Sequence, residues 1–242
     1  MITPPTFNHF GEQAVLLSWK PQIAPAIRDD IRQLDRLMHR ELSALFMETV
    51  PAYCSLTVFL HPWVDKEDFI RKTQVLYKQK QAQEKEHKTV VWQIPVCYDT
   101  SLGWDLEAFA KAKSMTTEEV ISLHTQETYE VYFLGFLPGF PYLGGLNERL
   151  HLPRKTKPSI KVPAGAVAIG GQQTGVYPVE SPGGWHILGQ TPIPFFLPEQ
   201  SPPSFLEAGH QIRFSAISLE AYRDIKARSE SAFMLPKKWN HK

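Results

Sequence analysis

The feature that most constrains this chain is a run of glycine, proline and aromatic residues at positions 133–145, FLGFLPGFPYLGG. Pro138 and Pro141 each remove a backbone donor and fix φ, which disfavours a long helix. The glycines permit positive φ or close backbone approach, and the rings supply large flat surfaces. The run is too apolar for an ordinary loop and too rich in glycine and proline for a regular strand. It predicts either a buried corner or the wall of a site.

A second run of similar character, VESPGGWH, occupies residues 179–186. It places the Ser181 hydroxyl and the amides of Gly183 and Gly184 beside the Trp185 ring. Free backbone amides at glycines bind anions or oxyanions. No general base is adjacent in the sequence, so a serine nucleophile has little support, and a tight turn anchored by Trp185 is an equal alternative. The function depends on whether the two runs face each other with a ligand between them.

Composition narrows the class of protein. Hydrophobic residues make up 43% and charged residues 21% of the 242 residues, and the formal net charge is +1. This balance is typical of a globular protein and gives no electrostatic basis for binding nucleic acid or an anionic membrane. No apolar run is long enough to span a membrane, and the first residues lack the features of a signal peptide, so we expect a cytoplasmic protein. Cys54 and Cys97 lie in apolar, β-like runs, which favours buried free thiols over a disulfide.

Proline and glycine divide the chain into two regions. Of 20 prolines, 12 lie between residues 138 and 203, and of 14 glycines, 12 lie between residues 135 and 209. Residues 1–87 read as β-α-β-β-α, followed by a strand that either closes this region on its far side or leads into the next domain. That order predicts a small ferredoxin-like α/β sandwich. Its first helix carries the apolar stripe Ile27, Ile31, Leu34 and Met38. The polar stretch 78–88 is interpreted as a helix end and linker, and residues 88–242 predict a β-barrel or sandwich. The fold class is therefore α+β.

The elements expected in each region follow from periodicity and capping residues. In the first region they are a strand within residues 10–19, a helix opened by Pro21 and Pro25, strands at 45–50 and 55–60, and a helix capped by Asp65. In the second region they are a strand at 89–96, helices at 105–113 and from Thr117 (capped by Thr116 or Thr117), a strand at 128–134, short strands at 166–169, 174–179, 186–189, 194–197 and 211–214, and a helix at 218–229.

Motifs for nucleotides and metals are weak. The glycine-rich segment 170–175 lacks the Gly-Lys-Ser/Thr ending of a phosphate loop and reads as a turn. The histidines do not pair at ligand spacing and no Cys-x-x-Cys accompanies them, so no metal site is predicted. His124 and His186 are each either hydrogen-bonding residues of a site or packed residues with satisfied nitrogens.

Basic residues cluster directly after the first run, at Arg149, Arg154, Lys155, Lys157 and Lys161. A solvated face is one interpretation, because exposed Lys and Arg are common. The alternative is that Arg154 or Lys161 points into a groove between the two runs. There it would bind a carboxylate or a phosphate, Arg through a bidentate fork.

A set of ordered motifs resembles one known family. The motifs are GFLPGFPYL at 135–143, Arg154, VPAG at 162–165, GxQTGxYP at 171–178 and ESPGGW at 180–185. They resemble the allophanate hydrolase subunit 1 family, which includes the B subunit of 5-oxoprolinase and the KipI-type inhibitors of sporulation kinases. The resemblance spans nearly the whole chain.

The resemblance implies a small N-terminal α/β domain followed by a cyclophilin-like β-barrel. It implies a partner, the subunit 2/C protein of the same family pair, and a third subunit with which the complex opens 5-oxoproline to glutamate using ATP. The chain would be inactive alone, and ATP would be used through the complex. The alternative within the family is an inhibitor that docks on a sensor histidine kinase, and a plain scaffold for subunit 2 is a third hypothesis. The residues expected to bind substrate or partner are His124, Phe136, Pro138, Gly139, Phe140, Pro141, Tyr142, Arg154, Lys161, Gln173, Tyr177, Ser181, Pro182, Gly183, Gly184 and Trp185.

Overall fold

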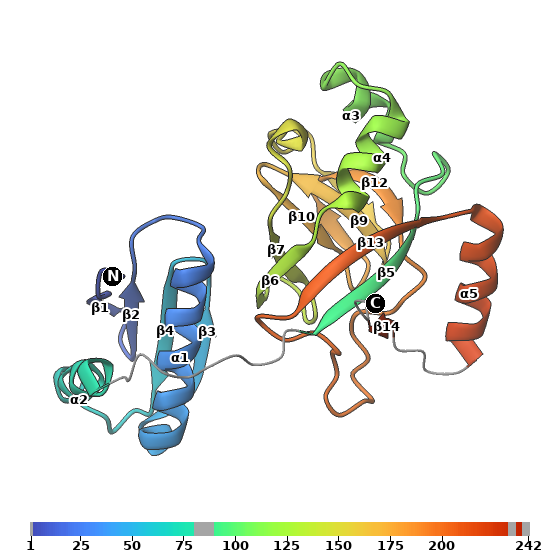
Figure 1. Cartoon of the computed structure of the whole chain (residues 1–242). Coiled ribbons are helices and arrows are strands. Elements are labelled where there is room, and N and C mark those ends of the chain that lie inside the picture. Colours follow the sequence, from blue (N-terminus) through green and yellow to red (C-terminus); the bar gives the residue numbers. More distant parts are fainter. Residues whose placement is uncertain (1, 80–89, 232–235, 239–242) are drawn as a thin grey trace. The chain divides into compact units, whose positions relative to one another are not determined.

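The computed structural model describes residues 2–79, 90–231 and 236–238. The chain divides into two compact units, residues 1–87 and 88–242, each with its own hydrophobic core (Figure 1). The predicted boundary between the domains falls within residues 80–89, and most of the stretch interpreted as a linker therefore lies outside the described residues.

The first unit is a ferredoxin-like α/β sandwich. Its elements are β1 (Thr6–Phe10), β2 (Ala14–Ser18), α1 (Pro25–Glu41), a short 3₁₀ turn η1 (Ser43–Leu45), β3 (Phe46–Pro51), β4 (Ser55–Leu60) and α2 (Lys66–Gln79). The strands pair antiparallel in the order β1-β2-β4-β3. The predicted β-α-β-β-α series is confirmed from β2 to α2. The strand after α2, Val91–Cys97, belongs to the second unit, and the fourth strand of this sheet is β1.

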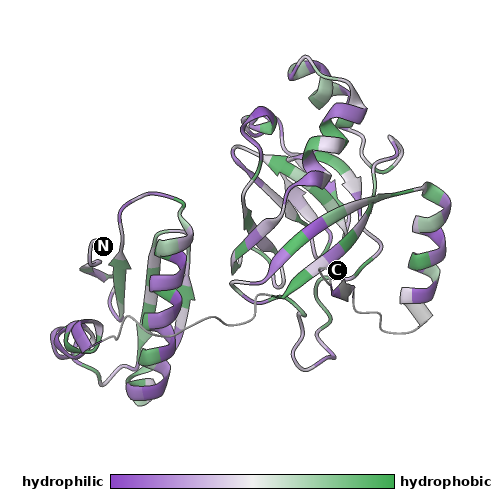
Figure 2. Cartoon of the chain, in the orientation of Figure 1, coloured by the Kyte–Doolittle hydropathy of each residue, from purple (hydrophilic) through white to green (hydrophobic). Residues whose placement is uncertain are grey.

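Helix periodicity determines which residues form the first core. On α1 the predicted stripe Ile27, Ile31, Leu34 and Met38 is buried, and Figure 2 shows hydrophobic and hydrophilic positions alternating around this helix. The helix begins at Pro25, where a missing backbone N–H costs nothing because the first amides of a helix have no partner within it. The stripe packs in one core with apolar side chains of β2, β3 and β4, which places α1 on a face of the sheet.

The α2 helix is capped as its sequence predicts. The Asp68 N–H donates to the Asp65 side-chain oxygen at 2.8 Å, which is the bond expected of an Asp N-cap. Phe69 and Ile70, near the start of the helix, are buried in the same core.

The second unit is a cyclophilin-like barrel with helices around it. Its elements are β5 (Val91–Cys97), α3 (Leu106–Ala112), α4 (Thr117–Gln126), β6 (Tyr129–Leu134), β7 (Pro141–Gly144), the 3₁₀ turn η2 (Glu148–Leu150), β8 (Ser159–Val162), β9 (Ala166–Gly170), β10 (Gln173–Val176), β11 (Ser181–Gly183), β12 (His186–Gln190), β13 (Gln211–Ile217), α5 (Leu219–Ser231) and β14 (Lys237–Lys238). The sheet runs β12-β9-β10-β7-β6-β13-β5, and the pairing of β12 with β5 closes it. β13 and β5 are parallel, β14 adds to β5, and β8 with β11 forms a separate two-stranded sheet.

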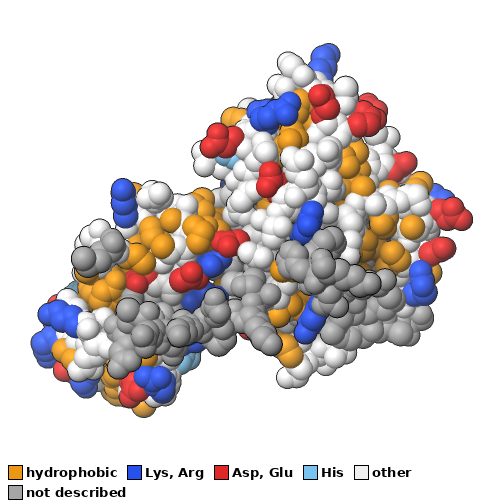
Figure 3. Space-filling view, viewed as in Figure 1, with side chains coloured by type: hydrophobic (Ala, Val, Ile, Leu, Met, Phe, Trp, Pro, Cys, Tyr) orange, Lys and Arg blue, Asp and Glu red, His pale blue; other side chains and the backbone are white. Residues whose placement is uncertain are grey.

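Around the barrel, α4 packs against β13, and α5 packs against β5 (Figure 1). The α4 helix opens with a capping box, in which Thr116 and Glu119 satisfy each other's backbone amides, so Thr116 is the cap. Large apolar side chains from the barrel strands, α3 and α4 fill the interior. On the face drawn in Figure 3, acidic and basic side chains are interspersed, which agrees with a net charge near zero.

Two strand predictions need correction. The expected strand at 194–197 is wrong: this segment is irregular, and the Leu197 N–H donates to the Pro203 carbonyl at 2.8 Å to close a loop. Prolines on both sides of it remove ladder donors, which confines such a run to loops and edges. Conversely, residues 141–144, judged too rich in glycine and proline for a strand, form β7. Pro141 is tolerated there because it occupies the first position of the strand.

Cys54 is partly buried and Cys97 is buried, and both are free thiols. Of the helices in residues 2–79 and 90–231, none combines the length and the apolar character that crossing a membrane requires.

Candidate functional site

The candidate site lies on the outer face of the barrel, over β7, β9, β10 and β12. Side chains of β9 and β10 alternate between the two faces, so Ile169 and Val176 enter the barrel core. The outward positions of the same strands carry small residues, namely Ala166, Ala168 and Gly170 on β9 and Gly175 on β10. A strip without bulky side chains leaves room for aromatic rings to lie directly on the sheet.

Phe140 is the centre of an aromatic cluster on this strip. Its ring meets four others edge-to-face, at centroid distances of 5.1 Å to Tyr142, 5.4 Å to Tyr177, 5.5 Å to Trp185 and 5.6 Å to Phe136. Edge-to-face pairs at these distances are favourable beyond the area they bury. The two glycine- and proline-rich runs therefore meet in direct contact, as one packed cluster rather than as two walls of an open groove.

The first run forms a tight turn that leads into β7. Gly135 donates its N–H to the Phe140 carbonyl at 3.1 Å, and Gly139, at φ +81°, has no room for a side chain because a Cβ would lie 2.8 Å from that of Phe196. Phe136 has the positive φ of 67° and is 64% exposed, and Pro138 is also exposed. The run is thus a buried corner at Phe140 and Pro141 with an exposed tip at Phe136 and Pro138.

Trp185 joins the second run to the basic cluster. Its indole lies over Gly170, where a Cβ would overlap the ring, and the side chain is 5% exposed. The Arg154 guanidinium sits above the same ring, with Cζ 5.8 Å from the centroid, in the geometry of a cation–π contact. The segment that carries Arg154 is held by the Lys155 N–H, which donates to the Gly184 carbonyl at 2.8 Å. The structure therefore brings Arg154 to the aromatic cluster.

The charge of Arg154 affects the pKa of two tyrosines in the cluster. Burial raises the pKa of Tyr142, and the nearby Arg154 charge partly opposes that rise. Burial also raises the pKa of Tyr177, against the opposing effects of a backbone hydrogen bond from Trp185 and of the Arg154 charge. Both phenols are therefore neutral at physiological pH, and the cluster presents one cation, Arg154, among uncharged rings.

Gln173 borders the same cluster from β10. It pairs with Gly170 across the β9–β10 ladder, so its side chain leaves the sheet beside the indole of Trp185. Its side-chain oxygen is buried and has no hydrogen-bond partner in the described part of the chain. A buried acceptor without a donor is uncommon in a folded protein and calls for an explanation.

The remaining residues of the second run are less central. Ser181, Pro182 and Gly183 form β11, where the Ser181 hydroxyl donates to the neighbouring Pro182 carbonyl at 3.3 Å. A Cβ on Gly183 would overlap the Tyr177 hydroxyl, whereas a Cβ on Gly184 would make only ordinary contacts, the nearest at 3.8 Å. Residues 181–183 are thus a short strand paired with β8, and not the tight turn that is one of the two interpretations of the sequence.

Lys161 does not join the cluster in the structure. It lies on β8 and forms an exposed ion pair with Glu180, at 3.2 Å between its amine and the carboxylate. Lys155 is likewise engaged, by Asp105 at 2.7 Å. Of the two residues proposed to point into the site, Arg154 is at the cluster and Lys161 is held elsewhere by a carboxylate.

His124 is a core residue. It is completely buried, its two ring nitrogens contact the Tyr98 hydroxyl at 2.7 Å and the Thr174 hydroxyl at 2.8 Å, and its ring stacks on Phe214. Burial lowers the pKa of His124 to about 3. This placement corrects its inclusion among the contact residues, because no atom of its side chain is accessible to a ligand.

His186 is also structural, since its Nε2 donates to the Pro153 carbonyl at 2.9 Å. Among the described residues, His, Cys, Asp and Glu side chains form no group of three that could hold a metal ion.

Comparison with known proteins identifies the family. The family model "Carboxyltransferase domain, subdomain C and D" matches residues 5–206. The chain is 36% identical to the 5-oxoprolinase B subunit of Bacillus subtilis over 232 residues, which are 92% of this chain and 97% of the relative. It is 39% identical to the 5-oxoprolinase B subunit of Escherichia coli O157:H7 over 206 residues, covering 84% and 92% of the two chains. The chain belongs to the 5-oxoprolinase B-subunit family.

The fold of this member of the 5-oxoprolinase B-subunit family also occurs in a larger enzyme. The crystal structure of Kluyveromyces lactis urea carboxylase superposes with a TM-score of 0.79 at 17% identity, covering 93% of this chain and 23% of that one. At this identity the match shows the fold alone. The names of the sequence relatives support the enzyme-subunit hypothesis and not the kinase-inhibitor hypothesis.

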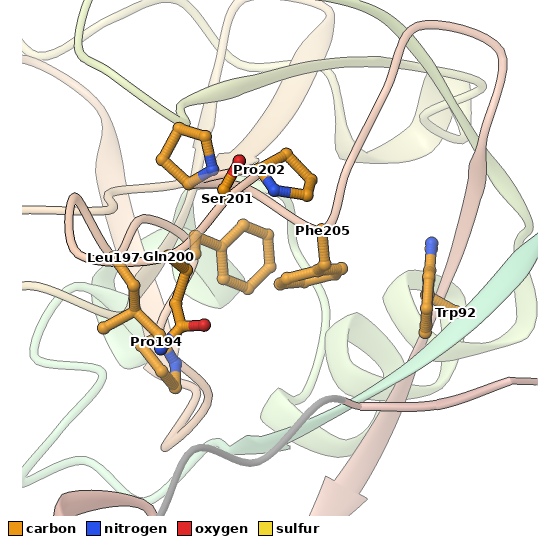
Figure 4. A pocket seen from close by; sticks show the side chains of 9 residues that line it. Trp92, Pro194, Leu197, Gln200, Ser201, Pro202 and Phe205 are labelled. Carbon is orange, nitrogen blue, oxygen red and sulfur yellow. The ribbon is translucent and has the colours of Figure 1, made fainter.

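Away from the cluster, this family member has a pocket that its sequence did not suggest. It has a volume of about 290 Å³ and lies between β5 and the loop after β12 (Figure 4). Its lining is Trp92, Pro194, Phe195, Leu197, Gln200, Ser201, Pro202, Pro203 and Phe205. Phe205 meets Trp92 edge-to-face at 5.3 Å and Phe195 at 5.2 Å. Five prolines between residues 192 and 203 are the feature of the sequence that marks this loop, and the strand expected at 194–197 does not account for them.

Proposed function

We propose that this chain is the B subunit of an ATP-dependent 5-oxoprolinase complex that opens 5-oxoproline to glutamate. The observation that carries the proposal is the match to the 5-oxoprolinase B subunit of Bacillus subtilis along 92% of this chain and 97% of that one. A match over nearly the full length of both chains supports equivalent proteins rather than one shared domain. The partners we propose are the subunit 2/C protein and a third subunit, in the cytoplasm, with ATP used by the complex.

We further propose that the outer-face cluster is the part of the substrate site that this chain supplies. At physiological pH 5-oxoproline carries one carboxylate, and Arg154 offers a guanidinium with no hydrogen bond or ion pair to any residue in the described part of the chain. A guanidinium fork matches a carboxylate in geometry and charge. The neighbouring rings of Tyr142, Tyr177 and Trp185 are uncharged, so no anionic side chain among them competes with the ligand for this guanidinium.

The test is reconstitution. The purified chain alone should be inactive, and mixing it with the other two subunits should give ADP release that depends on 5-oxoproline. In that complex Arg154→Ala should raise KM for 5-oxoproline by about 10- to 100-fold, as expected for the loss of a hydrogen-bonded charge. Arg149→Ala is the matched control, because Arg149 is an exposed arginine of the same basic cluster and lies on η2.

Two outcomes would count against the proposal. A reconstituted complex that releases no ADP in response to 5-oxoproline would remove the function. Full activity with unchanged KM in the Arg154→Ala complex would leave the function in place and remove the site assignment.

A further inference from the structure

Besides Arg154, the cluster contains a second group that lacks a hydrogen-bond partner among the described residues, the side-chain oxygen of Gln173. This oxygen is buried, and the strand position of Gln173 sets the residue beside the indole of Trp185. Cβ atoms of directly paired residues in an antiparallel ladder lie about 4.5–5.5 Å apart. Gly170, the partner of Gln173, is the residue that the indole covers, so Gln173 adjoins that ring.

Arg154 borders the same ring from the other chain segment. Residues 152–155 are tied to this place at two points, by the bridge between Leu152 and Gly171 and by the hydrogen bond from Lys155 to Gly184. Gly171 precedes the β10 strand of Gln173, and Gly184 precedes Trp185. The two ties therefore hold Arg154 near both the ring and the start of β10.

The Arg154 guanidinium and the Gln173 amide oxygen differ in charge, in hydrogen-bonding role and in exposure to solvent. Arg154 is a cationic donor, and Gln173 offers an uncharged acceptor. The Gln173 oxygen is buried, so a ligand reaches it only after a side chain moves. Arg154 is exposed, and among described residues its guanidinium is held by the stacking contact alone, which gives this surface a side chain able to move.

We propose that Arg154 and Gln173 form a two-point receptor for a molecule that carries a carboxylate next to an amide N–H. The guanidinium binds the carboxylate, the Gln173 oxygen accepts the N–H, and the Trp185 ring lies against the body of the ligand. The proposal rests on the proposed function, since 5-oxoproline has its carboxylate and its lactam N–H on the same carbon. It assigns Gln173 the role of distinguishing a lactam from an analogue without the N–H.

The experiment compares two ligands on the purified complex in the absence of ATP. The probes are 5-oxoproline and its lactone analogue, in which oxygen replaces the ring N–H, and calorimetry measures both dissociation constants. Wild-type complex should bind the lactam at least about tenfold more tightly, because a buried acceptor left unpaired penalises the lactone. This comparison needs no variant, so it holds even where a substitution disturbs folding.

Variants then assign the preference to residues. Gln173→Met should weaken lactam binding about tenfold, leave lactone binding unchanged and leave the melting temperature unchanged or higher, because it removes a buried unpaired oxygen. Gln172→Met, at the exposed neighbouring position, is the matched control and should change neither ligand. Arg154→Met should weaken both ligands equally, because both carry the carboxylate.

Failure of the two-point receptor can be distinguished from failure of the proposed function. Equal binding of lactam and lactone by wild-type complex, or an unchanged lactam preference in Gln173→Met, overturns the receptor. If the same preparation still cleaves 5-oxoproline with ATP, the proposed function stands without it. A lactam preference that depends on Gln173 in a complex with no such cleavage would keep the receptor and remove the function.

Discussion

At the scale of single residues, the barrel core contains one complete polar network around His124. The Thr174 hydroxyl donates to the Ala168 carbonyl at 3.1 Å, so it accepts from His124 Nε2, and the Tyr98 hydroxyl donates to Nδ1. These roles assign the neutral Nε2–H tautomer. Burial disfavours the charged imidazolium and so lowers the pKa of His124, and in the uncharged state both ring nitrogens have a partner.

This network predicts a pH-dependent contribution to stability. The pKa of His124 is about 3 in the folded chain, against an ordinary value of 6.5. Between those values the unfolded chain binds a proton that the folded chain does not, so the free energy of unfolding falls as pH decreases, by up to about 1.4 kcal/mol per pH unit from this group. Urea unfolding from pH 7 to pH 4 should show a shallower decline in His124→Gln than in wild type.

NMR of the His124 ring tests its protonation state directly. In an NMR titration the His124 ring signals should stay constant from pH 8 to about pH 4.5, well above the low pKa that burial gives this ring. A titration midpoint for His124 near the ordinary histidine value of 6.5 would show that the imidazolium form is stable in this network.

At the scale of elements, the site depends on strand β9 having almost no side chains on its outer face. Gly170 leaves room for the Trp185 indole, and Ala168 lies farther along the same face of the strand. Trp185 in turn supports the Arg154 guanidinium. A change on β9 is therefore transmitted to the cation–π contact that positions Arg154.

Two glycine-to-alanine substitutions test whether the loss of stability comes from the contact between Gly170 and the indole, or from any added side chain in the glycine-rich segments. Gly170→Ala places a methyl group in the indole and should destabilise the chain by about 1–3 kcal/mol, the usual cost of overpacking. Gly184→Ala, whose nearest neighbour would be 3.8 Å away, should stay within about 0.5 kcal/mol of wild type. Thermal unfolding and near-UV circular dichroism measure both effects. Equal losses in the two variants would contradict the packing argument.

The elements that the sequence predicted well are those marked by a regular spacing of apolar residues or by a helix-capping residue. The stripe on α1 and the caps of α2 and α4 are local signals, and the structure confirms them. β1 was missed because its residues are mostly exposed on an edge strand, so no alternation marks them. β7 was missed and the strand at 194–197 was wrongly expected because proline acts differently at the first position of a strand and inside a loop.

The site was predictable in composition but not in geometry. Arg154, Trp185, Phe140 and Tyr177 meet because register and the β8–β11 pairing bring distant segments together, which no local spacing encodes. His124 was included for its position before β6, but its spacing on α4 points it into the core. Whether a histidine is a core residue or a site residue depends on its hydrogen-bond partners. The partner Thr174 lies far along the chain from His124, so local sequence does not reveal it.

At the scale of the whole molecule, the chain consists of two units that complete their sheets separately. In residues 2–79 and 90–231 each sheet uses strands of one unit only. We propose that the domains are residues 1–87 and 88–242 and that each folds independently. Independent domains have their own cores, as both units do.

Separate expression tests this proposal. The fragments 1–87 and 88–242 should each unfold cooperatively, and the amide spectrum of each should overlay that of the intact chain except near the cut. A fragment that is unfolded alone but folds when the other is added would show that the units depend on each other for stability.

The parallel pairing of β5 with β13 has a consequence for the order of folding. Trp92 pairs with Ile212, so the barrel cannot close until a long intervening segment has been synthesised. Contacts this distant in sequence slow folding, because loop closure is required before they form. During synthesis the first unit can fold as soon as it emerges, while β5 waits with its apolar side chains exposed. The strand that follows the first unit thus stays unpaired for most of synthesis, and we expect a chaperone that binds nascent chains to act there.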